Sequence, residues 1–406
     1  MAHFNRGPGW WAVAAGVMAA GTTCSAIQPP SFLAFSAGPV LLRPRVDLGG
    51  QYNDNLFYAG KNSTNHIGDF ATLISPGLNV FVGRPEENFI SLDYTLDASF
   101  YVDNPGLNEV NHAIALRDHW HGAHLEVKGQ DKYEIISGIL GLGYNQNNKP
   151  IHRTHQTDTY TVSYDISQKS SVYVSGMYDA TDYESGVYLL DPTTWAGTAG
   201  IGLVVGPKTI VFSEVYYGQS KVGQNLPVTT PTPDVAFGGV FVGARGSFTP
   251  KLTGDAKIGY ELRQYSDNAS TPSGFVAEIE LEQYFTDRTS LKLTYRRRNT
   301  VSVEVAGQSY VMDLFGLLAR QRLGRGGKWV AEAGAVYQSN AYGSEPGIVF
   351  ANRHDSLYSL SFGLTYEIQL WLKASLTYDF SKLESNDKSV EDYDVSRITA
   401  KLTVGY

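Results

Sequence analysis

The sequence has few of the features that mark a disulfide-rich, nucleic-acid-binding or helical membrane protein. Its 406 residues include one Cys, so no intramolecular disulfide can form. Only 18% of the residues are charged and the formal net charge is −8, whereas a nucleic-acid partner requires a positive surface. Past residue 30, no apolar run approaches the ~18 residues of a membrane-spanning helix. These absences exclude a disulfide scaffold, a nucleic-acid-binding protein and a polytopic helical membrane protein.

The first 26 residues have the pattern of a secretory signal peptide. Arg6 precedes an apolar stretch from Trp10 to Gly21, and Cys24-Ser25-Ala26 approximates a small-x-small cleavage site. A lipoprotein signal is the alternative because of the Cys, although the residues before it lack the usual Leu. Residues 1–26 are therefore predicted to be removed during export, and residues 27–44 to form a periplasmic N-terminal segment or an internal plug.

The sequence is rich in Gly, Tyr and polar–apolar alternation with a period of two. It contains 42 Gly and 26 Tyr. Between residues 90 and 100, six apolar side chains alternate with five Ser, Thr or Asp. A strand sends successive side chains to opposite faces, so such a segment has one apolar and one polar face. Segments near 252–263, 358–368 and 398–406 repeat the pattern.

The spacing of these segments distinguishes a membrane barrel from a soluble sandwich. Short turns and longer polar loops alternate strictly along the chain, as in an up-and-down sheet whose two ends face different compartments. We predict about 18 strands, with 16 as the alternative, near 45–57, 67–82, 89–101, 109–121, 124–133, 158–167, 171–182, 194–205, 209–218, 235–247, 252–264, 274–285, 289–298, 308–322, 328–338, 356–368, 371–381 and 395–406.

The predicted fold is all-β: a transmembrane up-and-down antiparallel β-barrel over residues 45–406, with long outer loops and short periplasmic turns. Closure satisfies the backbone N–H and C=O groups within lipid. The apolar face would contact outer-membrane lipid and lipopolysaccharide, which predicts the outer membrane of a Gram-negative bacterium. Aromatic residues near strand ends fit two interfacial girdles: Tyr52, Trp120, Tyr178, Trp195, Tyr217, Trp329, Trp371 and Tyr406.

One predicted hairpin, between residues 274 and 298, supports this register. Glu282 would face Lys292 across the strand pair. Glu278 would face Arg296 in the same way, and opposite charges in such positions are favourable. Arg297 falls on the apolar face beside a long loop, where it is expected to reach the headgroup level or lipopolysaccharide phosphates.

Two stretches near the start of the predicted barrel are distinctive, Tyr52-Asn53-Asp54-Asn55-Leu56-Phe57 and Ser75-Pro76-Gly77-Leu78, and the repeated hairpins continue to the C-terminus. These strands resemble those of outer-membrane β-barrel porins that accompany exopolysaccharide gene clusters. The resemblance implies an approximately eighteen-stranded conduit for a secreted polysaccharide, which works with a periplasmic polysaccharide-export partner. The terminal Leu402-Thr403-Val404-Gly405-Tyr406 resembles the signal read by the barrel-assembly machinery.

An eighteen-stranded barrel would enclose a water-filled channel. Its candidate pore-lining residues are charged positions on the polar face: Asp93, Asp97, Asp165, Asp255, Lys257, Glu261, Arg263, Glu278, Glu280, Glu282, Lys292, Arg296, Glu332, Glu367 and Asp379. Acids slightly outnumber bases on the whole polar face and the signs are mixed. This balance favours a neutral or weakly charged glycan, or unselective small solutes, over a polyanion. The alternative for each residue is that it pairs across the wall and holds the barrel in shape.

The longest predicted connection, residues 134–157, is a candidate constriction. It carries an apolar core that includes Ile135, Ile139, Leu140 and Leu142. An apolar loop that faces water is unfavourable, so the loop is expected to fold into the pore or to pack on a neighbouring protomer. The alternative is that residues 135–142 extend the preceding strand.

Three histidines flank a short predicted turn at Gly122-Ala123. A two-residue hairpin would place His121 opposite His124 and His119 opposite Glu126. Three imidazoles and a carboxylate could bind zinc. Residues beside a short periplasmic turn are more often solvated, so neither a metal site nor a cofactor is predicted.

The sequence favours a channel over an enzyme. It has no Gly-x-Ser-x-Gly elbow, P-loop, His-Glu-x-x-His or paired-Cys motif. An outer-membrane hydrolase is a weaker alternative, because Ser63 and His66 lie in a loop with nothing to orient them. The expected function is export of an exopolysaccharide across the outer membrane. A general or nutrient-specific diffusion porin is the main alternative, and a structural or adhesive barrel is the third.

Overall fold

The computed structural model describes residues 33–85, 87–140, 149–187, 189–224, 234–266, 273–304, 308–343, 352–388 and 390–405. Within these ranges the chain forms one 19-stranded sheet and one short 3-10 helix, η1 (Pro105–Leu107). The described residues include no helix that is long and apolar enough to span a membrane. The predicted signal peptide, residues 1–26, lies outside these ranges.

Eighteen strands form the wall of a barrel and follow the predicted segments in order. They are β2 (Val40–Asn53), β3 (Asp69–Gly83), β4 (Phe89–Tyr101), β5 (Glu109–His121), β6 (Leu125–Gly138), β7 (Ile151–Ser167), β8 (Ser170–Tyr183), β9 (Leu190–Gly206), β10 (Thr209–Gln224), β11 (Val235–Thr249), β12 (Leu252–Tyr265), β13 (Gly274–Thr286), β14 (Thr289–Val301), β15 (Ser309–Leu323), β16 (Trp329–Tyr342), β17 (His354–Gln369), β18 (Leu372–Ser385) and β19 (Tyr393–Gly405). A short strand, β1 (Phe35–Ala37), forms an exposed hairpin with the start of β2.

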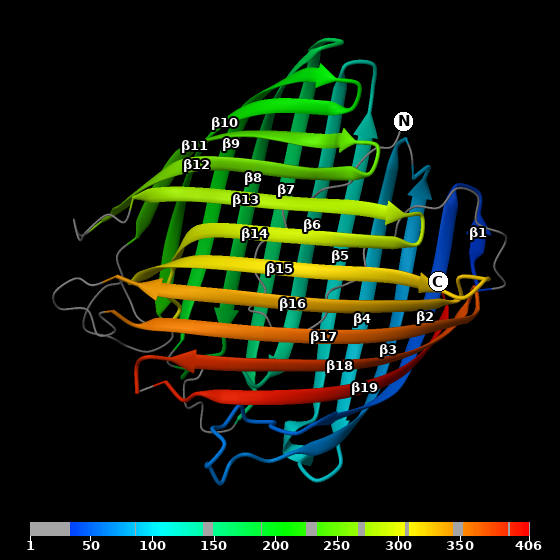
Figure 1. Cartoon of the computed structure of the whole chain (residues 1–406), viewed down its shortest axis with the longest axis vertical. Coiled ribbons are helices and arrows are strands. Elements are labelled where there is room, and N and C mark those ends of the chain that lie inside the picture. Colours follow the sequence, from blue (N-terminus) through cyan, green and yellow to red (C-terminus); the bar gives the residue numbers. More distant parts are fainter. Residues whose placement is uncertain are drawn as a thin grey trace.

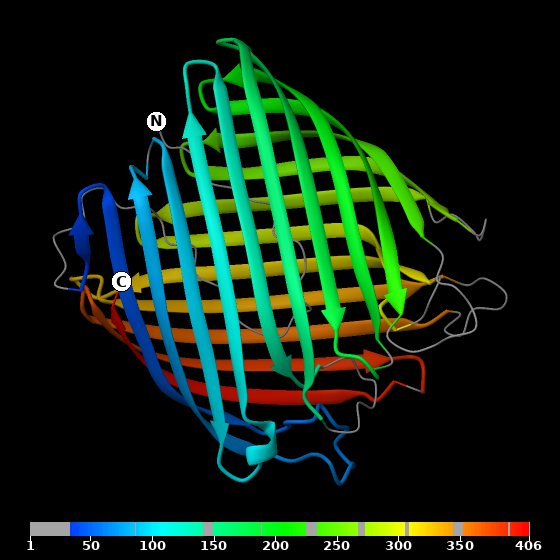
Figure 2. The ribbon, with the colours of Figure 1, turned by 180° about the vertical axis from the view of Figure 1, so that it is seen from behind.

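The sheet closes on itself because β19 pairs with β2, from Arg397 opposite Asn53 to Gly405 opposite Arg45. All other wall pairings are antiparallel and join strands that are consecutive in the sequence. In Figure 1, β12 to β19 run steeply across the strands of the opposite wall, and Figure 2 shows that wall from its own side. Strand tilt produces this crossing in a barrel. The predicted closed, 18-stranded up-and-down barrel is confirmed, and the 16-stranded alternative is wrong.

Side-chain exposure follows the predicted alternation. On β12, Ile258, Tyr260 and Leu262 are 48%, 51% and 61% exposed on the outside of the barrel. Glu261 and Arg263 between and beside them are only 7% and 8% exposed, on the inside. An apolar outer band of this extent needs lipid to cover it. Six of the predicted girdle residues are exposed: Tyr52, Trp120, Tyr178, Trp195, Tyr217 and Trp329. Trp371 is half-buried, and Tyr406 lies outside the described residues.

The Tyr-Asn-Asp-Asn stretch ties the first loop to the last strand at the closing seam. Asn55 is 0% exposed, and its Nδ2 donates to the carbonyl oxygens of Ala59 and Asp394, both at 2.8 Å. Asp54 accepts a hydrogen bond from the Ser396 amide at 2.7 Å and returns one from its own amide at 3.1 Å. Two of the residues that carry the family resemblance therefore have a structural role in closing the barrel.

Two boundaries differ from the prediction. β2 begins at Val40, so residues 40–44, expected to precede the barrel, belong to its first wall strand. β6 and β7 are longer than expected because their pairing continues to Gly138 opposite Ile151. The connection between these two strands is therefore 139–150 and not 134–157.

Candidate functional site: the lumen and its outer mouth

A cavity of about 1550 Å³ occupies the lumen. Strands β6 to β14 supply most of its lining, and residues of the outer connections supply much of the rest. Thirteen Asp or Glu and twelve Lys or Arg line it, so the signs are nearly balanced. A balanced lining concentrates neither cations nor anions strongly. The acidic excess expected from the whole polar face is almost absent at the cavity.

The structure divides the predicted pore-lining residues into two groups. Eight of them line the cavity: Asp165, Asp255, Lys257, Glu261, Arg263, Glu278, Glu280 and Arg296. The other seven are outside this cavity lining: Asp93, Asp97, Glu282, Lys292, Glu332, Glu367 and Asp379. Alternation still places them on the inner face, as exposed Leu92 and Tyr94 on either side of Asp93 illustrate. Seven of the eight predicted residues that line the cavity lie on β12, β13 and β14.

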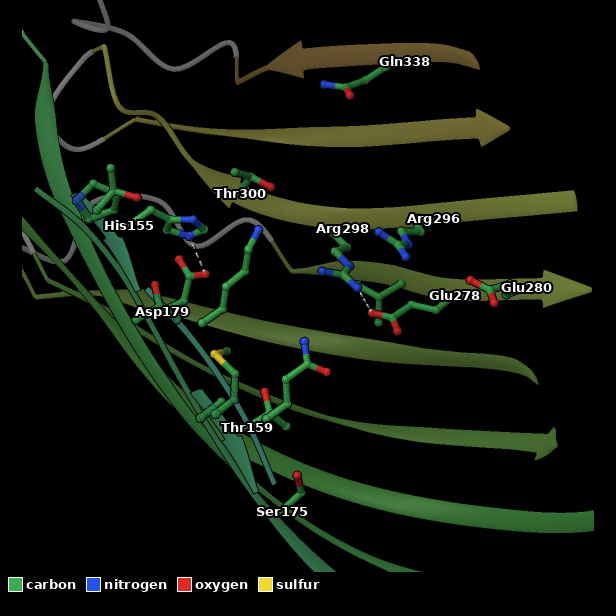
Figure 3. A pocket seen from close by; sticks show the side chains of 18 of the residues that line it. His155, Thr159, Ser175, Asp179, Glu278, Glu280, Arg296, Arg298, Thr300 and Gln338 are labelled. Atoms are coloured by element: carbon green, nitrogen blue, oxygen red, sulfur yellow. Dashed lines mark hydrogen bonds and ion pairs between the residues drawn. The ribbon is translucent and has the colours of Figure 1, made fainter. Parts of the chain in front are cut away.

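Two sides of the cavity differ in chemistry. On β7, β8 and β9 the inward side chains are mainly hydroxyls: Thr159, Thr161, Ser163, Ser171, Ser175, Thr194 and Thr198. On β12 to β14 they are mainly ionised. Figure 3 shows members of both groups around the same cavity, with Thr159 and Ser175 from the first side and Glu278, Glu280, Arg296 and Arg298 from the second. A bound molecule would meet mainly hydroxyl donors and acceptors on the first side, beside the His155–Asp179 pair (3.2 Å), and both signs of charge on the other.

The charges on the second side are paired in a belt around the wall. Lys257 Nζ lies 3.5 Å from a carboxylate oxygen of Glu214 and 3.4 Å from one of Glu278. Arg298 is 2.5 Å from Glu278, and the Tyr173 hydroxyl donates to Glu214 at 2.7 Å. These contacts join β8, β10, β12, β13 and β14. This belt of contacts supports the alternative that the charged residues pair across the wall and hold the barrel in shape. The same residues still line the cavity.

Several of the cationic side chains on the inner wall lie over aromatic rings. The guanidinium carbon of Arg245 lies 4.9 Å from the ring centroids of both Tyr173 and Phe212. These rings approach glycines closely: a Cβ on Gly243 would come within 2.7 Å of the Phe212 ring, and one on Gly200 within 2.3 Å of Tyr173. Cation–π contact holds a charge without neutralising it. The same arrangement recurs for Lys257 over Phe241 and Arg263 over Phe237.

The predicted charge register across β13 and β14 is confirmed, but the contacts are diagonal. Glu282 is opposite Lys292 and Glu278 is opposite Arg296. The ion pair of Lys292, however, is with Glu280 at 3.0 Å. Long side chains reach diagonal neighbours across an antiparallel pair, so the directly opposite residue need not be the partner.

Arg297 has a partner within the wall. It contacts the carboxylate of Asp313, the residue directly opposite on β15, at 2.5 Å. The Tyr295 hydroxyl donates to the same carboxylate at 3.0 Å. A counter-ion on the outer face reduces the cost of placing a charge beside lipid. The expected contact with head groups or lipopolysaccharide is therefore not needed to balance Arg297.

The connection between β14 and β15 folds across the outer mouth. The Leu190 amide donates to the carbonyl oxygen of Val303 at 2.9 Å, although four strands separate β9 from β14. The Ser302 amide donates to the carbonyl of Gln308 at 2.8 Å and closes the base of the connection. Val303 and Glu304 line the cavity. The described part of this connection therefore narrows the outer end of the lumen.

Arg353 holds Glu304 in place. Its side chain is 2% exposed, with Nη1 at 2.6 Å from Glu304 and Nη2 at 2.8 Å from Asp355. Burial raises the pKa of the Glu304 carboxyl, and the positive charge of Arg353 opposes this shift only in part. Burial alone would lower the pKa of Arg353, but Asp355 and Glu304 outweigh burial and raise it. A charged guanidinium is thus the counter-ion of two buried carboxyl groups.

The connection between β2 and β3 also packs into the outer end. Leu56 is 4% exposed and lines the cavity, as does Tyr58. The Tyr58 ring meets that of Tyr393 edge-on, with 5.0 Å between centroids. Tyr58 packs on an apolar cluster of Leu357, Leu383, Val390, Tyr393 and Val395. Apolar burial therefore fixes this part of the mouth.

The predicted constriction by residues 134–157 needs correction. Ile135 lies in β6 and is 44% exposed on the outer face, because strand pairing continues past it. The alternative, extension of the preceding strand, holds as far as Gly138. Ile139 and Leu140 follow the strand and line the cavity. Leu142 lies outside the described residues.

The histidines beside the β5–β6 turn adopt a different register from the expected one. Four residues, 122–125, separate the paired residues His121 and Glu126, so His121 faces Glu126 and His119 faces Lys128. Glu126 contacts both His119 and Lys128 at 2.9 Å. Lys128 thus already supplies a counter-ion to the carboxylate of the hypothetical zinc site. No group of three or more metal-ligating side chains occurs in the described part of the chain.

The sequence interpretation missed the residues of the outer mouth. Glu304 and Arg353 lie in connections, where there is no periodicity to indicate which way a side chain points. Leu190 is the first residue of a strand, and only the closed barrel brings it to Val303. The only indication in the sequence is that each of these polar loops contains a charged residue, Glu304 or Arg353. A charged residue in a loop does not show whether its side chain points into the lumen or outward.

Several solved outer-membrane proteins have similar structures at low sequence identity. OpdK from Pseudomonas aeruginosa is 10% identical, with a TM-score of 0.46 over 90% of this chain and 99% of its own. OpdO from the same organism is 8% identical, with a TM-score of 0.48 over 90% and 97%. The FrpB iron transporter from Neisseria meningitidis is 8% identical, with a TM-score of 0.49 over 90% and 81%. No curated protein matches the sequence significantly.

A protein-family model described as "Putative beta-barrel porin 2" matches residues 155–406, more than half of the chain. The matched region runs from within β7 to the C-terminus and includes the charged side of the cavity. The closed barrel, its apolar outer band and its charged lumen agree with that description. The chain therefore belongs to the Putative beta-barrel porin 2 family and is a porin-like barrel of a Gram-negative outer membrane.

Proposed function

We propose that this barrel is the conduit through which an exopolysaccharide crosses the outer membrane. The observation that carries the proposal is the hydroxyl-rich side of the lumen, where Thr161 and Ser175 lie 3.0 Å apart among other inward hydroxyls. A polysaccharide carries hydroxyl groups along its whole length. Weak, repeated contacts with such a surface replace hydration and allow movement without trapping. The nearly balanced charge of the cavity suits a neutral or weakly charged glycan.

Export also requires proteins outside the barrel. A periplasmic polysaccharide-export partner would deliver the chain to the short-turn end, and the barrel-assembly machinery would insert the barrel among outer-membrane lipid and lipopolysaccharide. The resemblance of the Tyr52 to Phe57 stretch to porins of exopolysaccharide gene clusters supports this arrangement.

Deletion of the gene tests the proposal. Export predicts loss of surface polysaccharide with normal uptake of small solutes, and the opposite result would refute it. Complementation with a Thr161→Val/Ser175→Ala variant should restore less polysaccharide than the wild type, because two lumenal hydroxyls are lost. Thr154→Val, on the outward side of the same strand, is the matched control and should restore it fully.

A general or nutrient-specific diffusion porin is the second candidate, and the narrowed outer mouth favours it. Val303 and Glu304 reduce the outer opening, which suits small solutes better than a polymer. Liposome swelling separates the two candidates. If the barrel is a porin, monosaccharides should enter the liposomes at rates that account for their uptake in cells. If it is an export conduit, monosaccharides pass through the barrel in liposomes, but deletion of the gene has no effect on growth.

A further inference from the structure

The short turns at the periplasmic end carry a row of cations. Five consecutive turns, from β7–β8 to β15–β16, contain six exposed basic residues, which we call the basic arc: Lys169, Lys208, Lys251, Arg288, Arg325 and Lys328. All residues of these five turns are described, and Asp287 is the single acid among them. Strict alternation of turns and loops brings these five turns to one rim of the barrel (Figures 1 and 2).

The outer wall beside the basic arc is apolar up to its edge. Ile166, Val205, Phe285 and Leu323 are 58%, 62%, 52% and 44% exposed on the outer face. Each precedes a residue of the basic arc by two or three positions. The hydrocarbon layer must extend to these apolar residues to cover them. The cations just beyond therefore lie at the depth of the lipid phosphates.

The residues of the basic arc keep their charge available. Among the described residues, none of the six forms an ion pair with a carboxylate. Lys251 Nζ donates to the carbonyl oxygen of Phe285 at 3.1 Å, and Lys328 Nζ to that of Ile368 at 3.2 Å. A carbonyl orients an ammonium group without neutralising it, and further N–H donors are left for another acceptor.

The rest of the rim is different. On the β3–β4 turn, Arg84 lies 3.2 Å from Glu87 and is neutralised locally. The β17–β18 turn, Leu370-Trp371, carries no charge. The basic arc therefore covers one side of the periplasmic rim and not its whole circumference.

We propose that the basic arc binds the phosphate groups of anionic phospholipids in the inner leaflet of the outer membrane. Ammonium and guanidinium groups recognise phosphate. Consecutive turns are two strands apart, about 10 Å, which is close to the width of one phospholipid. The apolar residues beside the basic arc, Ile166, Val205, Phe285 and Leu323, favour lipid over a periplasmic protein with an acidic surface. A phospholipid can cover these residues with its acyl chains while its phosphate contacts the cations.

Spin-label electron paramagnetic resonance of the full mature chain in phosphatidylcholine vesicles tests this binding. Spin-labelled phosphatidylglycerol should be enriched at the wild-type barrel at least about twofold over spin-labelled phosphatidylcholine. The enrichment should disappear as ionic strength rises, because the Debye length falls from about 30 Å at 0.01 M to 3 Å at 1 M.

Two matched variants locate the binding. Lys169→Gln/Lys208→Gln/Lys251→Gln should lose at least half of the enrichment. The variant Lys61→Gln/Lys149→Gln/Lys388→Gln removes the same charge from the outer connections and should keep the full phosphatidylglycerol enrichment. An equal enrichment in the two triple variants, or one that salt does not reduce, would overturn the proposal. If the first triple variant fails to fold, the single variant Lys169→Gln, which lies outside the cavity lining, replaces it and should reduce the enrichment. The wild-type salt titration then tests whether the remaining enrichment depends on charge. The assay contains no glycan, so its outcome is separate from that of the export proposal.

Discussion

The outer mouth and the periplasmic rim of this barrel are built in opposite ways. At the outer mouth, connections fold inward and bury polar groups such as Asn55 and Arg353. At the periplasmic rim the turns are only two to five residues long, and their charged side chains are exposed. A turn of that length has too few residues to cover a polar group. The inward-folded connections and the buried Arg353, Glu304 and Asp355 therefore belong to the same end of the molecule.

This difference has energetic consequences. A buried ion pair contributes little net stability, but the removal of one partner leaves an uncompensated charge and is strongly destabilising. An exposed cation makes a small contribution that salt screens. Equivalent substitutions at the two ends are therefore expected to differ in effect by several-fold.

The largest effect is expected for Arg353→Met. Glu304 and Asp355 would lose their counter-ion, which should cost about 3–5 kcal/mol in the free energy of unfolding. The conductance should rise as the Ser302–Glu304 segment moves away. Urea unfolding and single-channel recordings in planar bilayers measure the two quantities. Arg288→Gln on the periplasmic rim is the control, with an expected change within about 1 kcal/mol. Equal changes in the two variants would contradict the contrast between the ends.

Asn55→Ala should have the next largest effect. It removes two hydrogen bonds to the carbonyl oxygens of Ala59 and Asp394 and leaves buried acceptors unpaired, at a cost of about 1–3 kcal/mol. The midpoint of urea unfolding measures this loss. The exposed Asn65→Ala variant lies in the same connection and should leave the midpoint unchanged. A stable Asn55→Ala barrel would show that the seam does not depend on this stretch.

Mild acid should open the outer mouth. Because burial raises the pKa of Glu304, this carboxyl takes up a proton at a higher pH than an ordinary Glu. Protonation removes its ion pair with Arg353, so single-channel conductance should increase as the pH falls. Glu304→Gln is neutral at every pH and should lack this step. A step of the same size in Glu304→Gln would assign it to another group.

The smallest expected effect is on ion selectivity. Lys257→Met would leave Glu214 and Glu278 without their shared cation and make the lumen more acidic. The reversal potential in a KCl gradient should shift toward cation selectivity. Lys169→Met removes the same charge from the exposed rim, outside the cavity lining, and should shift the reversal potential less. A larger shift in Lys169→Met would mean that the rim, and not the belt, sets the selectivity.

Most of the wall could be predicted from the sequence, but its contacts could not. Alternation identified the β12 face with Lys257 and Glu261 because a period of two requires only local geometry. It placed Glu278 opposite Arg296 correctly, yet the ion pairs of this hairpin are diagonal. It misplaced His121 because the turn has two more residues between paired positions than expected, and alternation does not count turn residues.

The sequence by itself determined that this chain is a closed barrel with an apolar outside, since every strand carries its own two-faced pattern. Only the tertiary structure decided which residues meet across the lumen. Leu190 and Val303 lie far apart along the chain and on strands that are not neighbours, so their contact exists only after the sheet has curved and β19 has paired with β2. Such contacts depend on the curvature of the whole sheet, which no local pattern of residues encodes.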